Sequence, residues 1–130
     1  ILDIKTGYLE YANAGHNPTI YVPASGSLQL LKNISGPVVG AMEELEYQTF
    51  SLQLAPTDLL FLYTDGVTEG MNPDKELYGE ERLLRTLMLN ANRSSRELIQ
   101  AVCDDLKQFV DLAEQSDDIT MMVLRWHGRS

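Results

Sequence analysis

Two aspartate motifs flank apolar runs in a way that could build a metal site. Asp65 closely follows the apolar run 59–63, and Asp117 with Asp118 precedes the apolar run 119–124. A carboxylate at the end of a buried strand is costly unless a partner or a cation compensates its charge. If the two runs are antiparallel neighbours in one sheet, the end of the first lies beside the start of the second. The carboxylates would then meet, and Mg²⁺ or Mn²⁺ prefers such oxygen ligands.

Each acid also has a plainer interpretation. An Asp-Gly pair after a strand is typical of a turn, and Asp117 with Asp118 could be a loop that precedes a strand. Glu69 could be an acid that contacts the metal ligands without binding the metal itself, or it could simply be a solvated loop residue. The pattern of acids alone leaves these alternatives open.

Composition limits the class of protein. The 130 residues are 44% hydrophobic and 22% charged, which is typical of one globular domain spanning 1–130. The net charge of −9 argues against a non-specific nucleic-acid binder, which needs a basic face. The single cysteine, Cys103, excludes an intrachain disulfide and is compatible with a reducing, cytoplasmic compartment. No run approaches the roughly 20 apolar residues of a membrane-spanning helix.

The first half of the chain reads as antiparallel strands. Short glycine-containing connections predict two hairpins. The alternation of apolar and polar residues over 46–54 predicts a half-buried strand. The continuous apolar run 59–63 predicts a strand covered on both faces. The two predicted hairpins pair 1–4 with 8–12, and 19–22 with 28–31.

The second half of the chain reads as two helices and a last strand. An apolar face that includes Leu83, Leu87 and Met88 predicts a helix over 80–91. A capping box that begins at Ser94 opens a second helix that reaches residue 110. With the strand 119–124, these helices must cover a largely antiparallel sheet, so the predicted class is α+β.

The assembled motifs resemble the C-terminal half of a SpoIIE/RsbU-type phosphatase domain. This is the bacterial branch of the metal-dependent serine/threonine protein phosphatases of type 2C. The resemblance covers nearly the whole chain, and several motifs in order are more specific than a lone Asp-Gly pair. The motifs are YANAGHNP (11–18), GPVVG (36–40), LLFLYTDGVTEGMN (59–72), YGEERL (78–83) and SDDITMMVLR (116–125).

The resemblance implies a fold, a metal centre and a reaction. It implies an αββα sandwich, in which two antiparallel sheets lie between helix layers, with two Mn²⁺ or Mg²⁺ ions at one end. Asp65 and Asp117 match the family's metal ligands, with Gly66 and Asp118 as neighbouring secondary candidates. A metal-activated water would hydrolyse phosphoserine or phosphothreonine, so no catalytic side chain is required.

Two histidines remain to be interpreted. His16 lies in a family motif and could protonate the leaving alkoxide, or its ring could order a loop by hydrogen bonding. His127 follows Trp126 near the end of the chain and is interpreted as incidental.

The resemblance also predicts what the 130 residues lack. The family's first metal aspartate and its adjoining glycine carbonyl lie upstream of the matched region, so 1–130 is expected to be a truncated C-terminal part of the domain. Weak or absent activity is expected for this part alone. Unpartnered strands would leave sheet edges exposed, which invites pairing with a second copy in a homodimer.

Two functions from different classes follow. The first is a phosphatase that acts on a phosphorylated signalling protein, such as an anti-sigma-factor antagonist, and that is joined to an upstream sensory or receiver domain. The second is a non-catalytic interaction domain of the same fold with an incomplete metal site. An acidic motif in the upstream reading frame would favour the first.

Overall fold

The computed structural model describes residues 1–11, 17–26, 28–31, 50–111 and 119–128. These residues form an α+β domain, as predicted, in which strands come first, helices follow and a strand comes last. The elements are β1 (Tyr8–Tyr11), β2 (Thr19–Val22), β3 (Gln29–Leu31), β4 (Phe50–Gln53), β5 (Leu59–Tyr63), α1 (Asp65–Thr68), α2 (Gly79–Asn90), α3 (Ser95–Val110) and β6 (Met121–Arg125).

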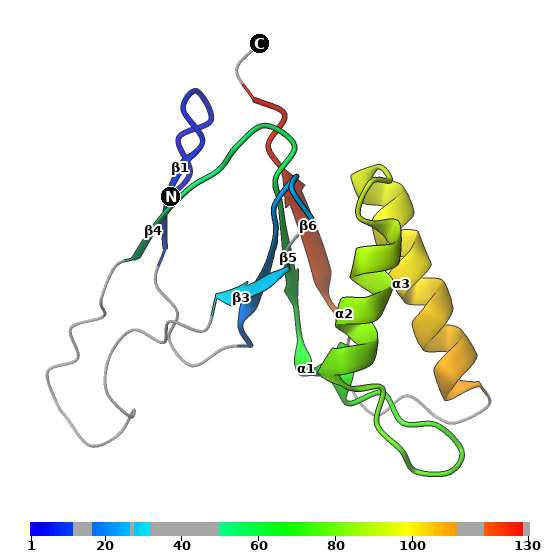
Figure 1. The fold of residues 1–130 in the computed structure, drawn as a ribbon. Coiled ribbons are helices and arrows are strands. Elements are labelled where there is room, and N and C mark those ends of the chain that lie inside the picture. The colour runs from blue at the N-terminus through cyan, green and yellow to red at the C-terminus, as the bar shows by residue number, and fades with distance from the viewer. Residues whose placement is uncertain (12–16, 27, 32–49, 112–118, 129–130) are drawn as a thin grey trace, which may run out of the picture.

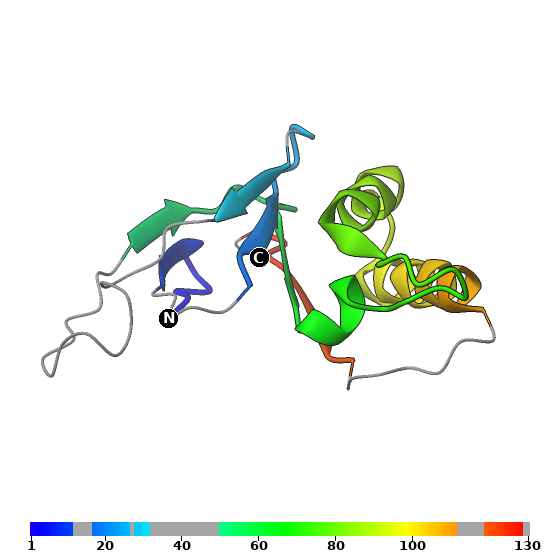
Figure 2. The ribbon, with the colours of Figure 1, turned by 90° about the horizontal axis from the view of Figure 1, so that it is seen from below.

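The described residues are arranged in three layers. Strands β3, β2, β5 and β6 form a four-stranded sheet in that order, and β1 pairs with β4 in a second sheet; every pairing is antiparallel. Figure 1 and the view from below in Figure 2 show α2 and α3 on one side of the larger sheet and the β1–β4 pair on the other. This helix–sheet–sheet order confirms the expected antiparallel sheets flanked by helices.

Strand β5 is the centre of the core because both of its faces are covered. Leu59 and Phe61 are buried toward the helices, in a cluster with Leu83, Leu87 and residues of α3. Leu60 points the other way, into a smaller cluster with Tyr21 and Leu54. Full burial of each such side chain contributes about 1.5–3 kcal/mol. The prediction of a strand covered on both faces is confirmed for residues 59–61, whereas Leu62 is 39% exposed.

The predicted hairpin of 1–4 with 8–12 is confirmed in part. Residues 1–3 pair with 8–10 through an antiparallel bridge between Leu2 and Leu9, and the Asp3 amide bonds the Tyr8 carbonyl at 2.9 Å. Residues 4–6 form a turn instead of continuing the strand. The turn forms because the Asp3 carboxylate accepts a hydrogen bond from the Lys5 amide at 2.9 Å, and the Gly7 amide bonds the Asp3 carbonyl. Gly7 has φ +78°, and a Cβ there would lie 2.6 Å from the Trp126 ring. The hairpin is thus confirmed, and its first arm ends at Asp3 because the turn begins at residue 4.

The two long helices match their predicted bounds closely. The Ser94 hydroxyl accepts a hydrogen bond from the Glu97 amide at 3.2 Å, which is the serine half of the predicted capping box. Met88 does not join the predicted core face, because it is 59% exposed beside a groove between α2 and the β2–β3 hairpin. No described helix is long and apolar enough to cross a bilayer.

A polar cluster joins α2 to α3. The Arg82 guanidinium donates two hydrogen bonds of 3.0 Å to the Asp105 carboxylate, one to each oxygen. The Tyr78 hydroxyl donates to Asp105 at 2.6 Å, and the Arg82 guanidinium lies 4.8 Å from the centre of the Phe109 ring. Because forked charge-assisted pairs are directional, this cluster fixes how the two helices lie against each other.

Acid should weaken this cluster in a defined pH range. Hydrogen bonding from Arg82, opposed by burial, lowers the pKa of Asp105 from 3.8 to about 2. A lowered pKa in the folded state stabilises the fold above the unfolded pKa, so this contribution is complete above about pH 4 and is lost as the pH falls through about 2. We expect a loss of about 1–2 kcal/mol over this range, measured by urea unfolding. In Asp105→Asn this part of the pH dependence should vanish; an unchanged pH profile would contradict the assignment.

A second carboxylate is buried at the start of β5. Asp58 is 1% exposed and accepts hydrogen bonds from the Tyr21 hydroxyl at 2.6 Å, the Ala24 amide at 2.7 Å and the Ala55 amide at 2.8 Å. Burial, reinforced by this hydrogen bond to Asp58, raises the pKa of Tyr21 to about 12. The satisfied carboxylate ties the turn before β5 to the β2–β3 hairpin.

Replacement of Asp58 by asparagine should be strongly destabilising. An amide NH₂ would face N–H donors that now bond the carboxylate, so the free energy of unfolding should fall by about 2–4 kcal/mol. Tyr21→Phe, which removes only one of the three donors, should cost about 1 kcal/mol. Urea unfolding of both variants checks the ratio, and equal losses would show that the hydroxyl, not the pair of amides, holds this site together.

Candidate metal site

The ends of β5 and β6 are held side by side by two threonines. Tyr63 is opposite Met121 in the antiparallel register, and the next pair is Thr64 opposite Thr120. The Thr64 amide donates to the Thr120 carbonyl at 3.0 Å, and the Thr64 hydroxyl accepts from the Thr120 amide at 3.0 Å. The predicted neighbourhood of the two strand ends is therefore confirmed.

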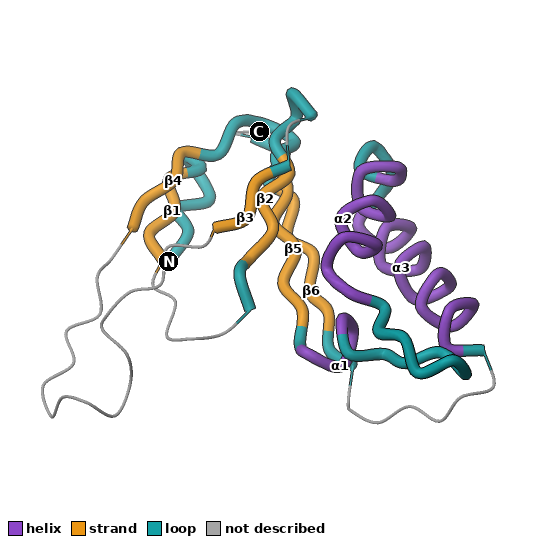
Figure 3. The backbone as a smooth tube through the Cα atoms, turned by 60° about the horizontal axis from the view of Figure 1, so that its bottom comes forward, coloured by secondary structure: helices purple, strands orange, loops and turns teal. Residues whose placement is uncertain are grey.

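Asp65 begins the short helix α1 at this edge of the sheet. Val67, which is fully buried in the core, anchors α1, and its amide bonds the Thr64 carbonyl at 3.0 Å. Asp65 is exposed, and within the described residues no hydrogen bond or ion pair engages its carboxylate. Figure 3 shows α1 directly below β5 and β6. The Asp-Gly pair is thus the first turn of a helix rather than an isolated turn, and Gly66 is buried within it.

The neighbourhood of Asp65 carries further negative charge. Tyr63 is half-buried, and its pKa is raised to about 12, first by burial and then by the charges of Glu80 and Asp65. Glu80 lies in the first turn of α2, so the start of α2 faces the same end of the sheet as Asp65. A cation at this end would be attracted by both carboxylates.

The remaining predicted site residues divide into two groups. Asp117, Asp118 and His16 lie outside the described residues. Glu69 is exposed at the end of α1, with its amide bonded to the Asp65 carbonyl at 2.8 Å. Within the described part of the chain, no group of three or more acid, histidine or cysteine side chains could hold a metal ion.

His127 lies at the opposite end of the larger sheet. Strand β6 begins beside Asp65 and ends at Arg125, so His127 follows it at the far end, where it lines the groove beside α2. This position is consistent with its interpretation as incidental to the metal site.

Sequence reasoning missed three residues at the site. Thr64 and Thr120 carry no signal beyond their position at strand ends, because threonine is common in strands. Glu80 was assigned to the helix dipole, and only the fold brings its charge near enough to raise the pKa of Tyr63. Their contributions depend on the tertiary arrangement of β5, β6 and α2.

The comparison with known families decides the class of the chain. The family described as Stage II sporulation protein E (SpoIIE) matches residues 1–127. The chain belongs to the SpoIIE family. Protein IcfG of Synechocystis is 37% identical over 124 residues, covering 95% of this chain and 19% of that protein. Phosphoserine phosphatase RsbP of Bacillus subtilis is 32% identical over 117 residues, covering 90% of this chain and 27% of that protein.

Solved structures show the same fold in this SpoIIE-family chain. The SiaA-PP2C domain of Pseudomonas aeruginosa matches 92% of the chain with a TM-score of 0.75 and 22% identity. The phosphatase domain of SpoIIE from Bacillus subtilis matches all of the chain with a TM-score of 0.73 and 18% identity. The chain spans 47% and 56% of these two structures. It is thus about half as long as the domains that it matches, and it spans a still smaller part of its curated relatives.

Loss of the Thr64 hydroxyl should loosen the start of β6. Thr64→Val keeps the side-chain shape but removes the acceptor of the Thr120 amide, so we expect a loss of about 1 kcal/mol and faster hydrogen exchange at Thr120. Thr68→Val, which lies in α1 outside the Thr64–Thr120 pair, is the matched control. Unchanged exchange at Thr120 in Thr64→Val would show that the backbone bond alone holds the strand ends.

Proposed function

We propose that this chain is part of a metal-dependent phosphoprotein phosphatase domain, with Asp65 and Asp117 as ligands for Mn²⁺ or Mg²⁺. The observation that carries the proposal is the β5–β6 register, which places Asp65 one residue beyond the Thr64–Thr120 pair. Asp117 precedes Thr120 by three residues, so the covalent chain keeps it within about 11 Å of Thr120. Membership in the SpoIIE family, whose relatives include phosphoserine phosphatases, supports the same reaction.

The described residues fit one part of such a metal shell. An exposed, unengaged carboxylate such as Asp65 is a suitable ligand for a hard cation, and Gly66 places no side chain next to it. When bound, a pair of divalent ions supplies an activated water and neutralises charge on the phosphoryl oxygens. The chain's own residues position the ligand: Val67 anchors α1 in the core, and the threonine pair fixes the strand end from which Asp65 projects.

The proposed substrate is a phosphoserine or phosphothreonine on a signalling protein. RsbP and RsbU of Bacillus subtilis are both named phosphoserine phosphatases, and they are 32% and 29% identical to the chain over most of its length. We extend this to a phosphorylated anti-sigma-factor antagonist as substrate, with an upstream sensory or receiver domain in the intact protein and a cytoplasmic location. Hydrolysis by water needs no protein nucleophile, and His16 stays a candidate proton donor.

The 130 residues by themselves should bind metal weakly. Mg²⁺ requires six oxygen ligands, and Asp65 with Asp117, Gly66 and Asp118 supplies only some of them. We therefore propose that the complete shell needs the family's upstream aspartate motif, and that these residues alone have little or no activity. The second candidate is a non-catalytic interaction domain of the same fold with an incomplete metal site.

Metal binding and turnover should depend on Asp65 and Asp117. In the protein that carries the complete domain, Asp65→Asn and Asp117→Asn should each lower the hydrolysis of a phosphoserine protein by about tenfold or more, because even the residues that support ligands are worth about 10–100-fold. Manganese binding, measured by electron paramagnetic resonance, should weaken in parallel. Glu10→Gln is the matched control, since it removes one exposed negative charge from the β1–β4 sheet.

Three outcomes separate the alternatives. If both variants keep wild-type turnover, the ligand assignment is wrong. If the wild-type protein binds no manganese and hydrolyses nothing, the interaction domain is favoured. If Glu10→Gln weakens manganese binding as much as Asp65→Asn does, the overall charge rather than a specific site attracts the ion.

A further inference from the structure

The short helix α1, which begins with Asp65, is held at both of its ends. At its start, the Thr64–Thr120 pair ties it to β6. After its end, the chain passes through Gly70, which is buried, before the loop that leads to α2. Because α1 has only four residues, its own hydrogen bonds cannot keep it in place. The position of Asp65 therefore depends on what holds Gly70.

The last turns of α3 pack directly against Gly70. A Cβ at Gly70 would lie 2.8 Å from Cδ1 of Leu106 and 3.4 Å from Cγ2 of Val110. Leu106 is only 3% exposed, and it belongs to the same buried cluster as Val67 of α1. The backbone after α1 can approach α3 this closely because Gly70 has no side chain. Leu106 therefore sets the distance between α3 and the end of α1.

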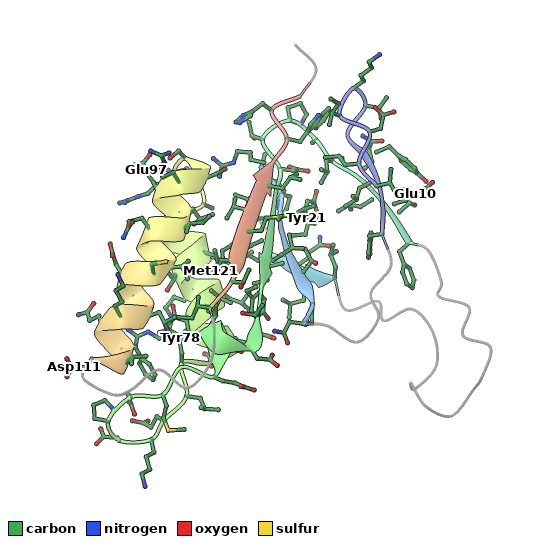
Figure 4. The ribbon with its side chains drawn as sticks, turned by 180° about the vertical axis from the view of Figure 1, so that it is seen from behind. Glu10, Tyr21, Tyr78, Glu97, Asp111 and Met121 are labelled. Carbon is green, nitrogen blue, oxygen red and sulfur yellow. The ribbon has the colours of Figure 1, made fainter. Side chains whose placement is uncertain are left out.

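The start of α2 fixes Gly70 a second time. The Tyr78 amide donates to the Gly70 carbonyl at 2.7 Å, and the Tyr78 hydroxyl donates to Asp105 of α3 at 2.6 Å. Figure 4 shows Tyr78 at the same end of the molecule as Asp111, the residue that follows α3. The polar cluster between α2 and α3 thus extends, through one backbone hydrogen bond, to the segment that follows α1.

We propose that Leu106 is a positioning residue for the metal ligand Asp65, which it holds in place through Gly70. This inference rests on the proposed function, because it gives α3 a role in the metal site. Gly70 follows Asp65 by only five residues, and a binding site needs its ligands held within about 0.5 Å. A carboxylate that the fold already holds in position loses less freedom when the cation binds, so the affinity is higher.

Leu106→Ala tests this role in the protein that carries the complete domain. Its manganese affinity, measured by electron paramagnetic resonance, should fall by about tenfold, as for other residues that support metal ligands. In the metal-free protein, hydrogen exchange of the Val67 and Glu69 amides should be at least about tenfold faster, because α1 would open more often. These amides bond the Thr64 and Asp65 carbonyls at 3.0 and 2.8 Å, so they report on α1 directly.

Leu98→Ala is the matched control. Leu98 is fully buried in the same cluster and lies on the same helix as Leu106. It precedes Leu106 by eight residues, which places it about 12 Å nearer the start of α3 and away from α1. Leu98→Ala should lower stability by a similar amount, but manganese affinity and exchange at Val67 and Glu69 should stay as in the wild type.

A second substitution should reverse the effect. Gly70→Ala in the Leu106→Ala chain adds a methyl group where the leucine side chain was removed, so it should restore part of the manganese affinity and of the protection at Glu69. If Leu106→Ala does not fold, Leu106→Val, which shortens the side chain but keeps it branched, provides the same comparison.

The outcomes separate this inference from the proposed function. If Asp65→Asn weakens manganese binding but Leu106→Ala has no larger effect than Leu98→Ala, the metal site stands and the role of Leu106 is overturned. If the wild type binds no manganese, the proposed function fails, and exchange in the metal-free protein decides whether Leu106 holds α1. Unchanged exchange at Glu69 would then overturn that contact as well, whereas faster exchange that Gly70→Ala reverses would support it.

Discussion

The antiparallel register of β5 with β6 is the constraint on which the proposed function depends. Five residue pairs, extended by the Thr64–Thr120 pair, set where one strand ends and the other begins. Without this register Asp65 would still follow a buried strand, but it would have no fixed relation to the segment that carries Asp117. The register in turn depends on the burial of β5 on both faces, because a slip of one residue would exchange its two sets of buried side chains.

The two aspartates that flank β5 show how environment decides the role of a carboxylate. Asp58 precedes the strand, is buried and accepts three hydrogen bonds, so its lone pairs are used by the fold. Asp65 follows the strand and is exposed, so its oxygens can accept a ligand. Asp105 resembles Asp58, since Arg82 and Tyr78 engage it between the helices. All three residues are aspartates. The structural ones differ from the candidate ligand because hydrogen-bond donors of the fold engage their carboxylates.

Much of the fold could be predicted from the sequence. The bounds of β5 agree with the apolar run, and those of α2 and α3 agree with the apolar stripes and with the cap at Ser94, because burial and capping are local properties. The predicted strand at 1–4 ends one residue early because a local hydrogen bond from the Lys5 amide to the Asp3 carboxylate favours a turn. The prediction that Met88 belongs to the buried face of α2 was wrong, because an apolar stripe on a helix does not reveal where the neighbouring sheet ends. Membership in the SpoIIE family confirmed the resemblance carried by the ordered motifs.

The sequence by itself determined the class of the fold, the family and the identity of the candidate ligands, because these depend on residue type, periodicity and motif order. Only the tertiary structure decided which strand ends meet, that Asp65 is exposed while the Asp58 carboxylate is hydrogen-bonded, and that the charge of Glu80 acts on Tyr63. These properties belong to pairs of residues that are far apart in the chain, and their positions depend on the strand register and the packing of the helices.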